Sequence, residues 1–212
     1  QAEDGIRDRS PSRGLGDVYK RQEDALCAAS LGADAIGLVF YPDSPRVVDV
    51  ELAQAISMAL PPFVDVVGLF VNANTGLIQE VIDAVRPTVL QFHGDEEPDD
   101  CSRFGLPYVK AIRMNSDTDL VACGRLYRKA TGLLLDASYE SLWGGGGQVF
   151  DWSLVPHDIS KPIVLAGGLT PDNVAKAIAT VQPYAVDVSG GVELKKGKKD
   201  ADKMARFIEA VR

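Results

Sequence analysis

The sequence predicts a (β/α)8 barrel, in which a closed ring of parallel strands is covered by helices. Seven short segments rich in Val, Ile and Leu recur without alternating polar and apolar residues, so both faces of these strands should be buried. Segments with helical spacing lie between them, and no break in composition marks a second domain. An open doubly wound sheet has the same alternation. Seven strands and one more make the barrel, whose loops must be tight because 212 residues are few for this fold.

The expected strands all have the character of a buried parallel sheet. They are DAIGLVF (34–40), VDVVGLFV (64–71), TVLQF (88–92), PYVKAIR (107–113), GLLLD (132–136), PIVLAGG (162–168) and AVDVSGG (185–191).

Apolar residues at helical spacing predict the helices. A helix is expected to begin near Glu23, and a later one to begin with Thr170 as its N-cap and Pro171 in its first position. Three further helices have apolar stripes, formed by Leu52, Ile56 and Leu60, by Leu77, Val81 and Val85, and by Met204, Phe207 and Val211.

The missing strand has to precede the helix near Glu23. That region contains AEDGIRD and SRGLGDVYKRQ, which together resemble a translated sequencing adapter, and strands disfavour the two glycines and the aspartate of GLGDVY. We therefore expect residues 1–22 to be a non-native segment that replaces or degrades the first strand. Residues 23–212 are expected to form the barrel. The alternative is a genuine but divergent first strand, which would leave poorly paired sheet edges beside it.

Charge and cysteine content exclude several classes of function. A net charge of -8 argues against binding nucleic acid, whose phosphates attract an excess of Lys and Arg. Cys27, Cys101 and Cys123 form neither a CxxC pair nor a disulfide framework. No apolar run approaches the roughly 20 residues of a membrane helix, and no secretory or transit signal is evident. We expect a cytoplasmic protein that acts on a small molecule.

Polar residues and glycines follow the strands at their carboxyl ends, where a barrel keeps its chemistry. In a closed barrel these residues would all lie at the same mouth. They are Arg46, Asn72, His93, Arg113, Asp136, Gly167, Gly168, Ser189, Gly190 and Gly191.

The two glycine motifs, LAGGLT and VDVSGGVE, follow the last two strands and predict a phosphate site. Glycine lets backbone N–H groups approach an anion, and loops at this place in a barrel commonly hold phosphate. Tight turns between strand and helix also favour glycine. The occurrence of both motifs at the last two strands favours the phosphate interpretation.

Asp136 is the candidate general acid, because a carboxyl group that emerges from an apolar strand into a pocket can hold its proton near neutral pH. An ordinary turn aspartate is the alternative. Arg46 could bind a carboxylate through two hydrogen bonds or lie in solvent, and His93 could line the pocket or a surface loop. Asp187 points either into the mouth or toward a helix, and periodicity leaves both open.

Several motifs in order resemble the phosphoribosylanthranilate isomerase family of tryptophan biosynthesis, over 23–212. They are EDALCAASLGADAIGLVFYPDSPR, LPPFVDVVGLFVNA, LQFHGDE, KAIR, LLLDA, FDWSL, KPIVLAGGLTPDNV and PYAVDVSGGVE. The resemblance implies an Amadori rearrangement of N-(5-phosphoribosyl)anthranilate without metal or cofactor, in a monomer or homodimer.

The resemblance also assigns roles to residues of this chain. Asp136 matches the acid that protonates the ring oxygen, and Arg46 matches the residue that faces the anthranilate carboxylate. His93 and Asp187 fall at recurrent pocket positions. The phosphate site matches Gly167, Gly168, Ser189, Gly190 and Gly191.

One family residue is absent from the sequence. The family's base is a cysteine in a KICGIT-like first strand, and an ungapped count back from EDAL places Asp17 there. The cysteines of this chain lie in expected helices. A barrel that binds a phosphorylated ligand without turnover is therefore an alternative. Another ribose-phosphate barrel, indole-3-glycerol-phosphate synthase or a histidine-pathway isomerase, is less well supported, since the synthase carries lysines at strand ends and VKAIR offers only Lys110 within a strand.

Overall fold

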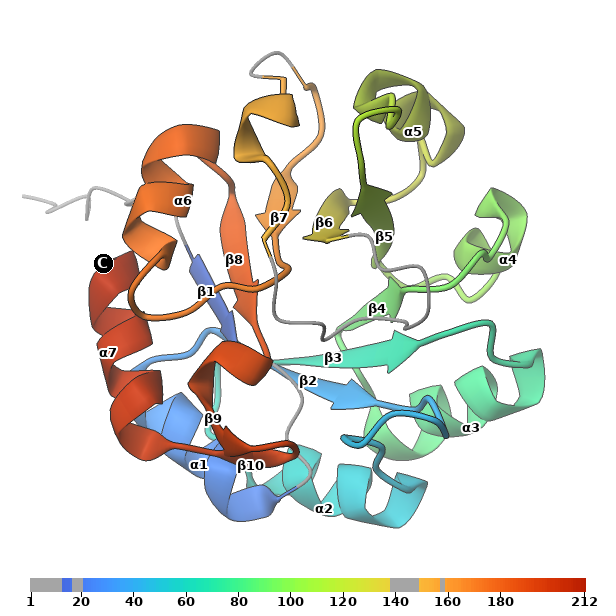
Figure 1. The fold of residues 1–212 in the computed structure, drawn as a ribbon. Coiled ribbons are helices and arrows are strands. Elements are labelled where there is room, and N and C mark those ends of the chain that lie inside the picture. The colour runs from blue at the N-terminus through green and yellow to red at the C-terminus, as the bar shows by residue number, and fades with distance from the viewer. Residues whose placement is uncertain (1–12, 17–20, 138–148, 157–158) are drawn as a thin grey trace, which may run out of the picture.

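In the computed structural model eight parallel strands form a closed barrel whose strand order follows the chain (Figure 1). The structure describes residues 13–16, 21–137, 149–156 and 159–212. The predicted fold class is confirmed. The strands are β1 (Arg13–Gly16), β2 (Ala35–Val39), β3 (Asp65–Phe70), β4 (Val89–Phe92), β5 (Tyr108–Met114), β6 (Gly132–Ala137), β7 (Ile163–Leu165) and β8 (Ala185–Val188).

The opening segment supplies the eighth strand. β1 pairs with β8 over four residues, from Arg13↔Ala185 to Gly16↔Val188. It pairs with β2 over only two, Leu15↔Ala35 and Gly16↔Ile36. The sequence RGLG thus occupies the place of the first strand and closes the ring, although its contact with β2 is short.

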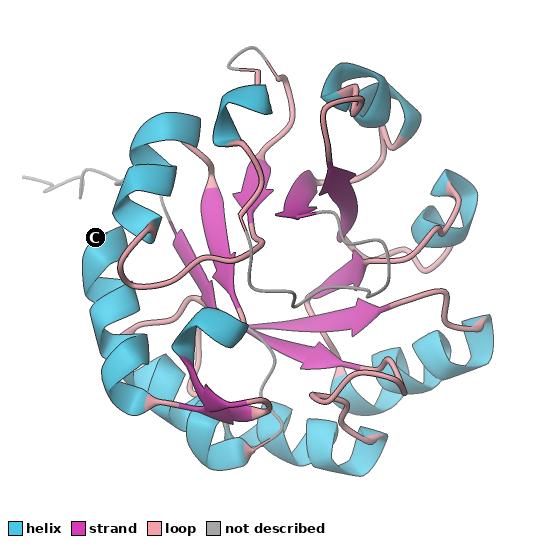
Figure 2. Cartoon of the chain, viewed as in Figure 1, coloured by secondary structure: helices cyan, strands magenta, loops and turns pink. Residues whose placement is uncertain are grey.

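Helices cover the outside of the barrel, as Figure 2 shows. They are α1 (Gln22–Leu31), α2 (Val50–Ala59), α3 (Thr75–Val85), α4 (Pro98–Ser102), α5 (Leu120–Leu126), α6 (Val174–Val181) and α7 (Ala201–Val211). Two short 3-10 turns, η1 (Trp152–Leu154) and η2 (Gly190–Val192), and a hairpin of β9 (Glu193–Lys195) and β10 (Lys198–Lys199) complete the described part. Within that part, no helix is both long enough and apolar enough to span a bilayer.

The start of α6 differs from the expectation. Thr170 is not its N-cap, because a turn intervenes and α6 begins at Val174 with Asn173 in the cap position. The Asn173 side chain accepts a hydrogen bond from the Thr170 backbone N–H at 2.8 Å and donates one to the Gly168 carbonyl at 3.0 Å. The asparagine therefore orders the loop after β7 instead of a Thr170 cap.

The barrel interior and the layer under the helices are two separate cores. Leu133 and Leu135 of β6 pack under the helices, whereas Leu134 lies in a small interior cluster. Since successive strand residues point to opposite sides, Asp136 lies on the interior side with Leu134. Ala185 likewise belongs to the interior cluster. The strand register therefore places Asp187 on the barrel-mouth side, which the sequence left open.

Candidate active site

A histidine and a carboxyl group contact each other at the mouth of the barrel. His93 Nε2 lies 3.0 Å from Asp136 Oδ2, and the Gln91 amide lies 3.3 Å from His93 Nδ1. All three side chains are buried. Both ring nitrogens of His93 are therefore engaged, which fixes the orientation of the ring, and a proton can be shared between His93 and Asp136.

The other carboxyl oxygen of Asp136 is also held. Oδ1 accepts a hydrogen bond from the backbone N–H of Ala137 at 2.8 Å. The Gly167 backbone packs against the same oxygen so closely that a Cβ at position 167 would lie 2.8 Å from it. The carboxyl group is thus fixed on both sides, as a positioned general acid requires.

Arg113 brings a positive charge to this end of the barrel. It is the register partner of Asp136 across β5 and β6, and its Nη2 lies 3.7 Å from Asp95 Oδ1. The sequence placed Arg113 at the mouth, and the structure agrees.

Arg46 is buried, and its partner is Glu193. The guanidinium donates through Nε to Oε1 at 2.7 Å and through Nη2 to Oε2 at 2.9 Å. Of the two alternatives that the sequence left open for Arg46, the structure has the bidentate contact and not the solvated side chain, but the contact engages a carboxylate of the protein. Glu193 lies just after the SGG motif, so Arg46 is tied to the loop that follows β8. A Cβ at Gly190 would lie 3.5 Å from Nη2 of Arg46.

The buried ion pair gives a prediction for stability. Arg46→Met is expected to lower the free energy of unfolding by about 3 kcal/mol, because breaking a buried pair leaves an uncompensated charge. The estimate is at the lower end of the usual range because Lys199 Nζ, 3.8 Å from Glu193 Oε1, partly compensates the carboxylate. Urea denaturation measures it. The double variant Arg46→Met/Glu193→Gln removes both charges of the pair but keeps an oxygen beside Lys199 and an acceptor for the Gly197 N–H. It should recover at least half of the loss, and a double variant no more stable than Arg46→Met would contradict this account.

The two glycine loops adjoin each other. Gly167 and Gly168 have φ values of 78° and 68°, which glycine adopts without strain. Gly191 packs against the backbone carbonyl of Leu169, so the loops after β7 and β8 touch. Lys199 Nζ donates to the Ser189 carbonyl at 3.0 Å. Because the C=O and N–H of a trans peptide point in opposite directions, the N–H of Gly190 points away from Lys199.

Gly167 combines a positive φ with a close backbone contact, so its replacement should be costly. Gly167→Ala is expected to lower the free energy of unfolding by about 2–4 kcal/mol, because a Cβ adds overlap to the strain of a positive φ. That Cβ would lie 2.6 Å from the Ala137 backbone nitrogen. Gly105→Ala is the matched control, since Gly105 has φ 71° and nothing within 4 Å of its Cβ position. The control should cost about 1 kcal/mol, and equal losses in denaturant titrations would refute the packing argument.

The three cysteines lie in helices, as the sequence predicted. Cys27 is in α1, Cys101 in α4 and Cys123 in α5. Burial raises the pKa of the Cys101 thiol to about 12 and also raises the pKa of Cys123. Both thiols are therefore protonated at neutral pH. Asp17 and the glycine-rich segment within 138–148 fall outside the described residues.

Four polar residues near the mouth were not predicted as site residues from the sequence: Gln91, Glu96, Lys110 and Glu193. Gln91 could have been found by the period of two that links it to His93 on β4. Glu193 and Arg46 are 147 residues apart, and no local pattern joins them.

The protein is a (β/α)8-barrel enzyme. The carboxyl ends of its strands hold a fixed histidine–carboxyl pair, a buried guanidinium and two adjoining glycine loops. The family model for N-(5′-phosphoribosyl)anthranilate isomerase matches residues 16–210. The chain belongs to this family.

Relatives with known names agree. N-(5′-phosphoribosyl)anthranilate isomerase of Pseudomonas savastanoi pv. phaseolicola is 58% identical over 191 residues, which cover 90% of this chain and 93% of that protein. The enzyme of Pseudomonas fluorescens Pf-5 is 59% identical over 192 residues, 91% of each chain.

Solved structures of the family have the same fold. The isomerase of Thermotoga maritima superposes with a TM-score of 0.84 at 40% identity, covering 93% of this chain and 98% of that one. A family structure in complex with reduced 1-(o-carboxyphenylamino)-1-deoxyribulose 5-phosphate also has a TM-score of 0.84, at 39% identity, covering 94% of this chain and 98% of that one.

Proposed function

We propose that this chain converts N-(5-phosphoribosyl)anthranilate to 1-(2-carboxyphenylamino)-1-deoxy-D-ribulose 5-phosphate. The observation that carries the proposal is the contact between Asp136 and His93 at the barrel mouth, in a chain of this family. The carboxyl group of Asp136 protonates the ring oxygen of the aminoaldose, so the ring opens. A base then removes the proton from C2, and the enolamine tautomerises to the ketone.

The phosphate group is assigned to the adjoining loops of Gly167, Gly168, Ser189, Gly190 and Gly191. The support is their close contact and the positive φ values in the first loop. Backbone N–H groups in such loops bind phosphate without a cationic side chain.

Arg46, His93 and Asp187 are proposed to contact the rest of the substrate. Arg46 lies beside Gly190 and carries the positive charge that the anthranilate carboxylate requires. Glu193 fixes its Nε and Nη2 edge, so the guanidinium is oriented before a ligand arrives. No metal or cofactor is part of the proposal.

The proposal also covers the domain boundary, the cellular location and the oligomeric state of the protein. Residues 1–22 are a non-native segment, and residues 23–212 form the native barrel; the chain works in the cytoplasm as a monomer or homodimer. The adapter-like sequence supports the first statement, and dimeric and monomeric forms of the Thermotoga maritima enzyme support the last. The charge of -8 supports the absence of a nucleic-acid partner.

Turnover of freshly prepared N-(5-phosphoribosyl)anthranilate by the purified chain, with identification of the ketose product, tests the proposal. Product formation above the uncatalysed rate is the expected result. A folded chain that binds a stable product analogue but forms no product would overturn the catalytic proposal and favour a barrel that only binds.

A further inference from the structure

Lys110 is a buried lysine outside the barrel interior. It lies on β5 between Val109 and Ala111, which belong to or pack against the interior cluster, so its side chain is on the helix-covered side. Only 2% of the residue is exposed. Its ammonium lies 5.5 Å from the centroid of the Tyr127 ring on the segment after α5.

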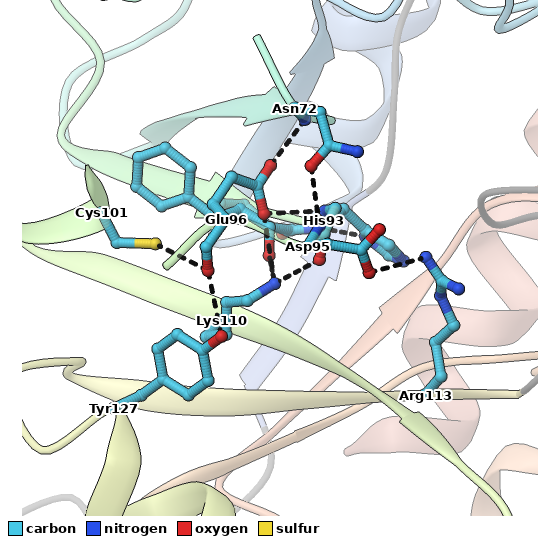
Figure 3. A network of polar contacts seen from close by, with 11 residues as sticks. Asn72, His93, Asp95, Glu96, Cys101, Lys110, Arg113 and Tyr127 are labelled. Carbon is cyan, nitrogen blue, oxygen red and sulfur yellow. Dashed lines mark hydrogen bonds and ion pairs between the residues drawn. The ribbon is translucent and has the colours of Figure 1, made fainter. Parts of the chain in front are cut away.

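The ammonium binds the loop after β4 at several points (Figure 3). Nζ donates to the Phe92 carbonyl at 3.3 Å and to the Gly94 carbonyl at 2.6 Å, and it lies 3.2 Å from Glu96 Oε2. His93 is the residue between Phe92 and Gly94. The lysine therefore holds a peptide group on each side of the histidine that contacts Asp136.

Glu96, the partner of Lys110, binds backbone N–H groups of the loops after β3 and β4. Its carboxylate accepts hydrogen bonds from the backbone N–H groups of Asn72 at 2.8 Å and Gly94 at 2.9 Å. The Asn72 side chain accepts from the Asp95 N–H at 2.7 Å. The ion pair thus joins the loops after β3 and β4, and both its members bind backbone groups next to His93.

The backbone carbonyl of Glu96 is held in turn by the Tyr127 hydroxyl at 3.0 Å. Burial raises the pKa of Tyr127 to about 12, so the hydroxyl stays a donor at neutral pH. The loop is fixed from β3, from β5 and from the end of α5, and its ends have little freedom to move independently.

We propose that Lys110 and Glu96 are positioning residues for His93, and through His93 for Asp136. The consequence for catalysis rests on the proposed function, whereas the consequence for the His93 ring does not. A buried ion pair contributes little net stability compared with apolar side chains of similar volume. The bonds of this pair to the peptides that flank His93 give it a geometric role.

The test compares Lys110→Met with the double variant Lys110→Met/Glu96→Gln. Both lack the ammonium that binds Phe92 and Gly94. The double variant leaves no unpaired carboxylate in the loop, so it provides a folded sample if Lys110→Met is too unstable. Lys161→Met is the matched control, because Lys161 also donates to two backbone carbonyls, of Arg128 and Ala130, but at the opposite end of the barrel before β7.

The first measurement is the 1H–15N spectrum of the imidazole rings. The chain has two histidines, so His157→Gln assigns the signal of His93. We expect the His93 ring signals to move in both Lys110 variants and to keep their wild-type positions in Lys161→Met. The second measurement is steady-state turnover, where kcat should fall by about 10- to 100-fold with a much smaller change in KM, as for a misplaced catalytic group.

Unchanged His93 signals in the double variant would overturn the inference, and so would an equal displacement in Lys161→Met. A wild-type chain without turnover would contradict the proposed function only, because the ring signals alone then decide the positioning role. Displaced ring signals with unchanged kcat would overturn the link from His93 to Asp136.

Discussion

Asp136→Asn is expected to lower kcat by about 10²- to 10⁴-fold, the contribution typical of a general acid. The amide has nearly the same shape as the carboxyl group and can still accept the Ala137 N–H. It cannot deliver a proton to the ring oxygen of the substrate. Turnover of freshly prepared N-(5-phosphoribosyl)anthranilate under saturating conditions measures the loss.

The same change at a surface position provides the control. Asp151 is exposed and caps η1, where it accepts a hydrogen bond from the Ser153 N–H at 3.0 Å. Asp151→Asn should leave kcat and KM unchanged. The affinity of Asp136→Asn for inorganic phosphate should also match that of the parent chain, which shows an intact mouth. A kcat within tenfold of the parent would remove Asp136 from the role of acid.

The strands could be predicted from the sequence because continuous apolar runs, such as GLLLD and PIVLAGG, indicate strands that are buried on both faces. The position of Asp136 at the end of a strand follows from the same pattern. The direction of the Asp187 side chain could not be predicted in this way, because it depends on which residues of β8 face the barrel interior. Ala185 in the interior cluster supplies that information.

The partners of the buried charged residues could not be predicted from the sequence, for a different reason. Arg46 and Glu193 meet only when the barrel closes, and Lys110 finds Glu96 and the flanking carbonyls through the register of β4 and β5. A lysine inside an apolar strand looks unfavourable until three acceptors are placed around it. Its environment, and therefore its role, depends on tertiary structure.

The first strand is where sequence and fold disagree most. RGLG is a poor strand sequence, yet Arg13–Gly16 pairs with both neighbours and closes the ring. Backbone hydrogen bonds require no particular side chain, so two strong neighbouring strands can recruit a weak segment. Closure of the barrel is therefore no evidence that the native first strand is present.

The base for the C2 proton is the remaining chemical requirement, and the cysteines do not meet it. Cys27, Cys101 and Cys123 lie on helices, and burial keeps the thiols of the last two protonated at neutral pH. In the family the base is a cysteine of the first strand, at the position that the ungapped count gives to Asp17. The segment before α1 thus decides whether this chain is a complete catalyst.

Replacing residues 15–20 by the family-like Lys-Ile-Cys-Gly-Ile-Thr, which places the cysteine at position 17, is expected to raise kcat by about 10²-fold or more. The graft supplies a base and exchanges Gly16 for isoleucine, which should add about 1 kcal/mol to the free energy of unfolding. The same graft with serine at position 17 separates the two effects, because it should gain the stability without the turnover. Turnover and urea denaturation of the parent and both grafts provide the comparison.

A parent chain as active as the cysteine graft would mean that residues 1–22 are a working first strand and that Asp17 or a bound water removes the proton. A serine graft as active as the cysteine graft would mean that the strand, and not the thiol, was the missing element.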